Sequence, residues 1–319
     1  MATDSSVPDE LDPQDRIEFV LVVGAGWVGR QIVGQMAAHG VHVSWMDQSS
    51  EALSSGIRWI LDHRKSIVEQ KKWPPECADS MEARIATTTD LETIQQRPGL
   101  VLESVTEQIS VKRRVLQSVA SRFDSPTIIA SNSSYFTPSM LDRFVSRPER
   151  FANFHFHVPV WITQLVDIAA GKQTAPSTLQ RLQDLAVRIG QYPLVQTVEN
   201  PGYVFNWLLR SLLQASLQLL DRGVASPQQI DMAWKSVTKM PIGPFGMMDQ
   251  IGIDLIHQTM SAARFVDGDS VWQPLIDQLQ PLIDSNQLGV KTGAGFFDYG
   301  RDEPPTDLSF DPEDPVEPT

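Results

Sequence analysis

Cysteine, long apolar runs and basic clusters are all scarce in this chain of 319 residues. The one cysteine, Cys77, excludes an internal disulfide and a metal cage built from several thiolates, and it fits a reducing compartment. No apolar run approaches the length that spans a bilayer, and residues 1–15 lack the basic and apolar regions of a signal peptide. We therefore expect a cytoplasmic protein without a membrane partner.

Basic residues are absent from both ends of the chain, where the acidic residues concentrate. Residues 1–15 carry five acids and residues 302–319 carry seven, so most of the formal charge of −13 belongs to the tails. The tails, 1–15 and 301–319, hold few large apolar side chains, and we expect them to be flexible. No basic face of the kind that nucleic acid requires is evident, so no nucleic-acid partner is expected.

The body of the chain has two parts with different patterns. Through residue 198, short apolar runs alternate with helical patterns, which predicts an α/β domain with a Rossmann-type, doubly wound, mainly parallel sheet. A long helix is expected over 50–72, where Trp73-Pro74-Pro75 stops it. The expected strands cover 17–23, 41–46, 84–87, 100–103, 127–130, 151–156, 165–169 and 194–198.

The second part, 199–300, is expected to be an all-α C-terminal domain. It follows Asn200-Pro201-Gly202, and Gly223 is placed to end its first helix. The next helix starts at Ser226-Pro227-x-Gln229, which has the spacing of a capping box. The first helix carries one apolar stripe, made of Phe205, Leu208, Leu212, Ala215 and Leu219.

A glycine-rich loop follows the first expected strand. Gly24, Gly26 and Gly29 separate that strand from a helical pattern, in the order that a dinucleotide-binding fingerprint requires. Such glycines let backbone N–H groups approach a pyrophosphate at a helix N-terminus. We place Trp27 and Val28, which lie between the last two glycines, in the same cofactor site.

Asp47 ends the second expected strand, where an acid holds the ribose hydroxyls of the cofactor. Its charge would repel a 2′-phosphate, and no arginine follows within residues 48–51. The sequence therefore favours NAD over NADP.

His155 closes one expected strand and Asp167 lies in the next. A carboxylate that accepts from one imidazole nitrogen leaves the other nitrogen able to take a proton, which makes a general base near neutral pH. A base that faces a bound nicotinamide is the arrangement that oxidises an alcohol, because the base takes the hydroxyl proton while the nicotinamide takes hydride. A lone strand histidine is otherwise more often a core residue. His157 points to the same side as His155 if the strand continues past Phe156, and the inference lapses if the strand ends there. We interpret His157 as pocket lining, and the alternative is that it shares the base role.

Several ordered motifs resemble the signature of the L-3-hydroxyacyl-CoA dehydrogenase family. The likeness covers the body from Ile17 to Tyr299. It implies an NAD domain, a helical domain that forms a homodimer interface, an acyl-CoA substrate and a role in fatty acid metabolism. The motifs are Ser131-Asn132-Ser133-Ser134, Arg150-Phe151, His155-Phe156-His157-Val158-Pro159, Leu165-Val166-Asp167, residues 200–206, residues 241–245 with Asp249 and Gly252, and residues 288–299.

The resemblance implies a role for each matching residue. His155 matches the family's catalytic base, which takes the 3-hydroxyl proton while hydride passes to NAD, and Asp167 matches its partner carboxylate. Ser134 and Asn206 match the groups that hydrogen-bond the reacting oxygen and the imidazole. No metal is implied. Two matches near the nicotinamide half of the cofactor are Glu107 and Lys112.

The chain also departs from the family pattern. Val158 stands where the family has Asn, and Asp167 stands where it has Glu, which is one methylene longer. On the helix after the second strand, His63 and Gln70 replace the Ser and Lys that the family directs to CoA. Arg64, Lys65, Lys71 and Lys72 are nearby cations that could serve instead.

Two alternative functions therefore stay open. One is an NAD-dependent dehydrogenase of a free 3-hydroxy acid of the carnitine or gulonate type. The other is a non-catalytic NAD-binding protein, in the manner of lens crystallins recruited from this fold. The presence of Ser134, His155 and Asn206 argues against the second alternative.

Overall fold

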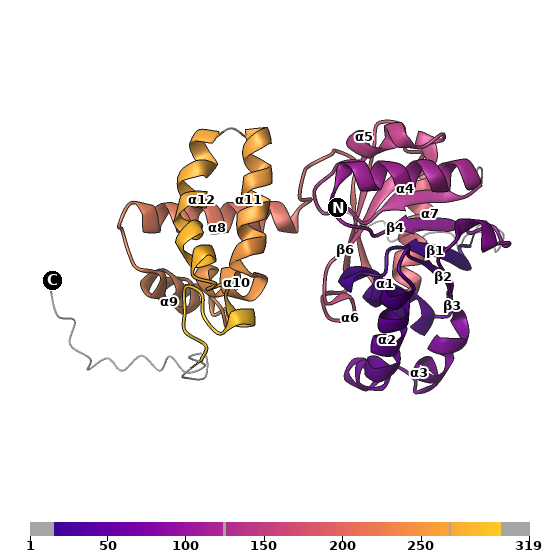
Figure 1. Ribbon diagram of the computed structural model, residues 1–319, viewed down its shortest axis with the longest axis horizontal. Helices are drawn as coiled ribbons and strands as arrows, with labels where there is room; N and C mark the ends of the chain where they lie inside the picture. Colours follow the sequence, from indigo (N-terminus) through magenta and orange to yellow (C-terminus); the bar gives the residue numbers. More distant parts are fainter. Residues whose placement is uncertain (1–15, 124–125, 268, 301–319) are drawn as a thin grey trace, which may run out of the picture. The chain divides into compact units, whose positions relative to one another are not determined.

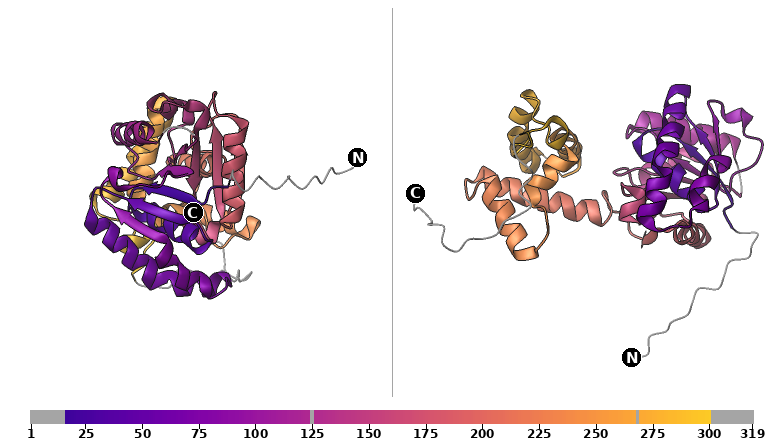
Figure 2. Two further views of the ribbon diagram at one scale, coloured as in Figure 1. Left: turned by 90° about the vertical axis from the view of Figure 1, so that its right-hand side faces the viewer. Right: turned by 90° about the horizontal axis from the view of Figure 1, so that it is seen from below.

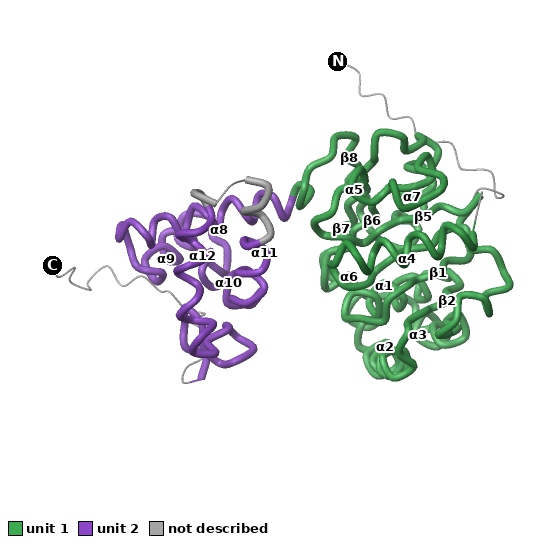
Figure 3. The backbone as a smooth tube through the Cα atoms, turned by 45° about the horizontal axis from the view of Figure 1, so that its top comes forward, with its two compact units in different colours: residues 1–204 green, residues 205–319 purple. Residues whose placement is uncertain are grey.

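The structure is a computed structural model that describes residues 16–123, 126–267 and 269–300. The chain divides into two compact units with the boundary between Val204 and Phe205 (Figure 3). The sequence places the change of pattern near residue 199, and the structure keeps 199–204 with the first unit. The two acidic tails, expected to be flexible, lie outside the described residues.

The first unit is built on an eight-stranded sheet with the order β3-β2-β1-β4-β5-β6-β7-β8. Neighbouring strands are parallel except β6 and β7, which are antiparallel. This confirms the mainly parallel, doubly wound sheet. The strands are β1 (Phe19–Val23), β2 (His42–Met46), β3 (Ile85–Thr88), β4 (Leu100–Glu103), β5 (Ile128–Ser131), β6 (Phe151–Phe156), β7 (Leu165–Ala170) and β8 (Tyr192–Gln196).

Helices cover both faces of this sheet (Figures 1 and 2). Successive residues of a strand point to opposite faces, so β1 contributes to two cores. Val20 and Val22 pack in the core that includes α1 (Trp27–Ala38), whereas Leu21 packs in the core that includes α4 (Ile109–Arg122). The other helices of this unit are α2 (Ser50–Lys71), α3 (Glu76–Met81), α5 (Pro138–Leu141), α6 (Val160–Thr163) and α7 (Pro176–Arg188).

The last strand differs from the sequence prediction. β8 begins at Tyr192, two residues before the expected start, and it ends at Gln196 rather than residue 198. Tyr192 pairs with Leu165 of β7, and Pro193 follows within the strand. Because β8 is at the edge of the sheet, a proline that donates no hydrogen bond is tolerated there.

Helices make up most of the described second unit, as expected, and its C-terminal motif adds two isolated β-bridges, Gly289 with Ala294 and Ala294 with Asp298. The capping box at Ser226 and Gln229 is present, and Gly223 has the left-handed backbone (φ 64°) that ends the preceding helix. None of the described helices is both long and apolar enough to cross a membrane. The helices are α8 (Phe205–Asp221), α9 (Pro227–Thr238), α10 (Pro244–Ile251), α11 (Ile253–Asp267) and α12 (Asp269–Asp284).

The core of the second unit uses a different face of α8 from the stripe seen in the sequence. Leu213 and Leu217 are buried against α10, α11 and α12, with Leu209 and Leu220 beside them. The stripe identified from the sequence is largely exposed: Leu208 is 57% and Leu219 is 39% accessible. Helix α8 therefore has two apolar faces, and periodicity alone does not tell which one packs in the core.

The C-terminal motif is held to this core by Asp249. Its carboxylate accepts the N–H groups of Phe296 and Phe297 and the hydroxyl of Tyr299. A Cβ atom on Gly289 or Gly295 would overlap Asp249. Contacts to Asp249 therefore explain why the motif has glycine at positions 289 and 295, without reference to any ligand.

Candidate active site

The glycine loop after β1 has the local geometry of a dinucleotide cradle. Gly24 has a φ of 115°, and a side chain there would strike the backbone of Ser104, which follows β4. A Cβ on Gly29 would overlap the carbonyl oxygen of Gly24, so glycine lets α1 pack close to the loop. Gly26 is different, because a Cβ there would meet nothing within 4 Å. Its backbone borders open space at the start of α1, where a pyrophosphate would lie.

Trp27 and Val28 begin α1 beside this space. Trp27 is 53% exposed, whereas Val28 is only partly accessible and packs against the core. Gly26 has no side chain with which to cap α1, so the first N–H groups of the helix stay available to an anion. The residues of the loop thus fit a dinucleotide.

Asp47 lies at the carboxyl end of β2 and contacts the same loop. One carboxylate oxygen accepts the N–H of Ala25 at 2.7 Å, and the other accepts the N–H of Ser49 at 2.9 Å. Each oxygen can accept a further hydrogen bond. The side chain is therefore fixed beside the loop while retaining acceptor capacity for ribose hydroxyls.

His155 and Asp167 face each other across the antiparallel pair β6 and β7. The two residues are direct partners in the strand register, so their side chains emerge on the same face of the sheet. Nδ1 of His155 lies 3.2 Å from Oδ2 of Asp167. Both residues are buried, with 5% and 0% accessibility. The prediction that Asp167 contacts one nitrogen of His155 is thus met by the geometry.

The other nitrogen of His155 lies beside a hydroxyl group. Ser134 Oγ is 3.2 Å from Nε2 of His155, and Ser134 is exposed, so this end of the ring is nearer the surface of the unit. Tyr203 stacks on the His155 ring with a centroid separation of 4.7 Å and an angle of 13°. The stacking fixes the plane of the imidazole. Nothing in the sequence pattern distinguishes Tyr203 as a neighbour of His155, although it lies in one of the motifs.

Tyr203 is itself held by hydrogen bonds. Its hydroxyl donates to the carbonyl oxygen of Ser133 and accepts from Nδ2 of Asn153. Burial raises the pKa of Tyr203, so the hydroxyl keeps its proton. The residues after β8 thereby connect to β6 and to the loop that carries Ser134.

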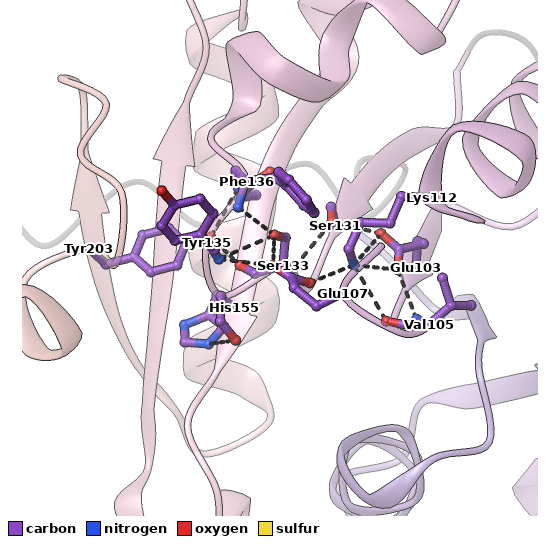
Figure 4. Close-up of polar contacts among 12 residues, drawn as sticks. Glu103, Val105, Glu107, Lys112, Ser131, Ser133, Tyr135, Phe136, His155 and Tyr203 are labelled. Atoms are coloured by element: carbon purple, nitrogen blue, oxygen red, sulfur yellow. Dashed lines mark hydrogen bonds and ion pairs between the residues drawn. The ribbon is translucent and has the colours of Figure 1, made fainter. Parts of the chain in front are cut away.

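Glu107 and Lys112 belong to a polar network that reaches Ser133, the neighbour of Ser134 (Figure 4). Lys112 is 1% exposed and contacts Glu103 at 2.9 Å and Glu107 at 3.1 Å. Glu107 in turn accepts the hydroxyl of Ser133 and the N–H of Tyr135. Lys112 is therefore a buried support for Glu107 in this structure.

Glu103 is a member of this network that the sequence analysis did not single out. It is fully buried at the end of β4 and accepts the hydroxyl of Ser131 at 2.7 Å, in addition to the Lys112 ammonium. Its only signal in the sequence is an acid at the end of an otherwise apolar run.

His157 adds a second imidazole to Asp167. Its Nε2 lies 2.7 Å from the same Oδ2 atom that His155 contacts, and its ring centroid is 4.7 Å from that of His155. The interpretation of His157 as pocket lining is therefore incomplete. Gln196 of β8 donates to Oδ1 of Asp167 at 3.2 Å.

Burial and hydrogen bonding set the protonation of this cluster. Burial lowers the pKa of His155 because the imidazolium loses solvation, while Asp167 opposes this effect. Burial acts to raise the pKa of Asp167, but the hydrogen bonds from His155 and His157 outweigh it and hold the pKa below its usual value. A neutral imidazole beside an ionised carboxylate is the resting state that a general base needs.

His155, His157 and Asp167 are also residue types that bind metal ions, and their ligand atoms lie within 4.8 Å of one another. Both imidazoles already face one carboxylate oxygen at hydrogen-bond distance. Protons on the two nitrogens account for these contacts, so we interpret the cluster as a hydrogen-bond network.

The remaining predicted positions lie on α8 and α2. Asn206 is the second residue of α8 in the second unit, where it is partly buried. On α2, His63 is exposed and stacks on Trp59 at 4.6 Å, and Gln70 is exposed. Two of the nearby cations are engaged within the unit: Arg64 contacts Glu82, and Lys71 contacts Gln164.

Comparison with protein-family models gives two matches in tandem. The model for the 3-hydroxyacyl-CoA dehydrogenase NAD binding domain matches residues 19–199, and the model for the C-terminal domain matches residues 202–299. The human mitochondrial hydroxyacyl-coenzyme A dehydrogenase is 29% identical over 288 residues, which cover 89% of this chain and 91% of the relative.

Two solved structures are similar over nearly their full length. The (S)-3-hydroxybutyryl-CoA dehydrogenase of Ralstonia eutropha has a TM-score of 0.82 and 29% identity, covering 89% of this chain and 100% of that one. A diketoreductase that acts on dicarbonyl compounds has a TM-score of 0.81 and 30% identity, covering 89% and 99%.

Proposed function

Because the chain belongs to the 3-hydroxyacyl-CoA dehydrogenase family, whose two domain models span residues 19–199 and 202–299, we propose that His155 is the general base of its NAD-dependent reaction. The reaction is oxidation of an L-3-hydroxyacyl-CoA to the 3-oxoacyl-CoA, or the reverse. The observation that carries the assignment is the orientation of His155: Nδ1 faces buried Asp167 and Nε2 faces the exposed Ser134.

Each side chain has a separate part in the proposed mechanism. Nδ1–H of His155 donates to Asp167, which leaves the Nε2 lone pair to accept the proton of the substrate 3-hydroxyl. The ionised carboxylate then stabilises the imidazolium. Ser134 is proposed to hydrogen-bond the reacting oxygen, and Asn206 is proposed as a further polar group of the reaction. NAD, when bound, supplies the acceptor for hydride from C3.

The cofactor site is proposed to consist of Gly24, Gly26, Trp27, Val28, Gly29 and Asp47. The open space beside Gly26 supports approach of the pyrophosphate. Glu107 is proposed to act near the nicotinamide, and Lys112 to support it through their 3.1 Å ion pair.

A test of this function follows oxidation of NADH with acetoacetyl-CoA, free acetoacetate and a dehydrocarnitine-type substrate in parallel. Turnover of the CoA ester alone is expected. His155→Ala is expected to abolish turnover while NAD still binds, and persisting turnover in that variant would refute the assignment of the base. No turnover of any of the three by the unaltered protein would favour the crystallin-like alternative.

The second candidate is reduction of a carbonyl compound that carries no CoA. Two observations favour testing it: the similarity to a diketoreductase, and the presence of His63 and Gln70 on α2 in place of a serine and a lysine. Turnover of free acetoacetate or a dehydrocarnitine-type substrate without the CoA ester would select this function. If added free CoA leaves the rate of that turnover unchanged, the result would further support a substrate without CoA.

We also propose that the protein is a cytoplasmic homodimer that acts in fatty acid metabolism. The exposed apolar face of α8, which includes Leu208 and Leu219, supports a dimer interface in the helical unit. Light scattering coupled to size-exclusion chromatography tests this: the unaltered chain should have the mass of two copies, and Leu208→Glu should shift it toward one copy.

A further inference from the structure

His157 makes the shorter of the two histidine contacts to Asp167. Its Nε2 is 2.7 Å from Oδ2, whereas Nδ1 of His155 is 3.2 Å from the same atom. An ionised carboxylate can only accept hydrogen bonds, so both facing nitrogens must carry hydrogen. Because all three side chains are buried, these contacts are charge-assisted hydrogen bonds that are poorly screened by water.

We propose that His157 is a positioning residue for the dehydrogenase reaction, because its Nε2–H holds the short side chain of Asp167 within reach of His155. This inference rests on the proposed function and names a residue to which that function assigns no part. His157 acts through Asp167 and touches no reacting atom, so it is distinct from the base.

The geometry explains why a second anchor is needed. Aspartate is one methylene shorter than the glutamate expected at this position, so its carboxylate cannot reach as far across the strand pair. Here Oδ2 accepts from the two imidazoles of β6 and its extension, and Oδ1 accepts from Gln196 of β8. Donors on both sides of β7 therefore fix the plane of the carboxylate.

A fixed carboxylate determines which nitrogen of His155 is basic. With Asp167 in place, the proton of neutral His155 stays on Nδ1 and Nε2 keeps its lone pair. If the carboxylate rotates away, the proton is free to move to Nε2, and the ring can no longer accept the substrate proton there. The loss should therefore appear in kcat and in the tautomer of His155.

Two substitutions separate the hydrogen bond of His157 from its volume. His157→Phe keeps a ring but removes the donor. His157→Gln restores a donor, since its Nε2 and that of histidine are both four bonds from Cα. His42→Phe, at the exposed first residue of β2, is a control for loss of a histidine.

The tautomer of His155 is read from the imidazole ¹⁵N resonances of the full-length protein without substrate, and kcat and KM are measured with acetoacetyl-CoA and NADH. We expect Nδ1–H in the unaltered protein, in His157→Gln and in His42→Phe, and a mixture in His157→Phe. We expect kcat of His157→Phe to fall on the order of tenfold with unchanged NADH affinity, as for loss of one hydrogen bond to a charged group. His157→Gln should recover most of kcat.

Equal impairment of the Phe and Gln variants would overturn the proposal, because ring volume would then be what matters. An unchanged tautomer and an unchanged or increased kcat in His157→Phe would overturn it as well, by showing that His157 only competes for the carboxylate. The tautomer requires no turnover, so an inactive unaltered protein would refute the proposed function and leave this measurement decisive for His157.

Discussion

Gly26 offers a test of the cofactor site that is separable from folding. A Cβ at Gly26 would meet nothing within 4 Å, and its φ of −73° is accessible to alanine. Gly26→Ala should therefore fold normally but place a methyl group where the pyrophosphate is proposed to approach the N-terminus of α1. Gly29→Ala adds the same methyl group where it overlaps the Gly24 carbonyl oxygen, at under 3.0 Å.

Gly26→Ala should weaken the binding of NAD, whereas Gly29→Ala should lower the free energy of unfolding. For Gly26→Ala, reduced entropy of the unfolded chain gains about 0.4–1 kcal/mol, and the poorer helix cap costs a similar amount. The free energy of unfolding should stay within about 0.5 kcal/mol. Steric conflict with bound NAD should cost roughly 1–3 kcal/mol, which weakens binding about 5- to 150-fold. Gly29→Ala should instead lose about 1–3 kcal/mol of stability, or about 2–4 °C in Tm per kcal/mol.

Titration calorimetry with NAD and differential scanning calorimetry of both variants check these values. The expected result is a cofactor defect without a change in Tm for Gly26→Ala, and a lowered Tm for Gly29→Ala. NAD binding by Gly26→Ala with the affinity of the unaltered protein would refute the placement of the pyrophosphate beside this residue.

Three further predictions concern charge. Asp47→Ser should raise the ratio of kcat/KM for NADPH to that for NADH, because the carboxylate no longer repels a 2′-phosphate, and an unchanged ratio would contradict the role of Asp47 in cofactor choice. Because burial lowers the pKa of His155, the inactivating protonation of its imidazole has its midpoint below the ordinary histidine pKa. The acidic limb of a pH profile of kcat/KM should therefore have its midpoint below about pH 6.5, and a midpoint at higher pH would count against His155 as the base. Lys112→Met leaves the buried Glu103 carboxylate without its ion pair and should lose about 3–5 kcal/mol in denaturant unfolding, whereas the exposed Lys65→Met should change stability by less than about 0.5 kcal/mol.

Much of the fold could be predicted because the residues that indicate a strand, a turn or a helix start are close together in the sequence. The run before Gly24 predicts β1, and the glycine spacing predicts the turn into α1, since these depend on the backbone of adjacent residues. The same holds for the capping box at Ser226. The error at β8 arose where a proline is tolerated only because the strand is at the edge, and edge position is a property of the whole sheet.

The face of α8 that packs in the core could not be predicted, because both faces are apolar. Leu208 and Leu213 are equally suited to burial, and only the positions of α10, α11 and α12 select Leu213. An amphipathic pattern identifies a core face only where the opposite face is polar.

The candidate site shows the same division. The sequence by itself determined that one domain contains a nucleotide-binding loop and, on two consecutive strands, a histidine and a carboxylate. These features depend only on residue type and on the order of the strands along the chain. Only the tertiary structure decided that Asp167 is shared by His155 and His157, that Tyr203 covers the His155 ring, and that Lys112 is buried against Glu103. These contacts depend on the register of β6 against β7 and on how segments distant in sequence pack together, and no short stretch of residues encodes either one.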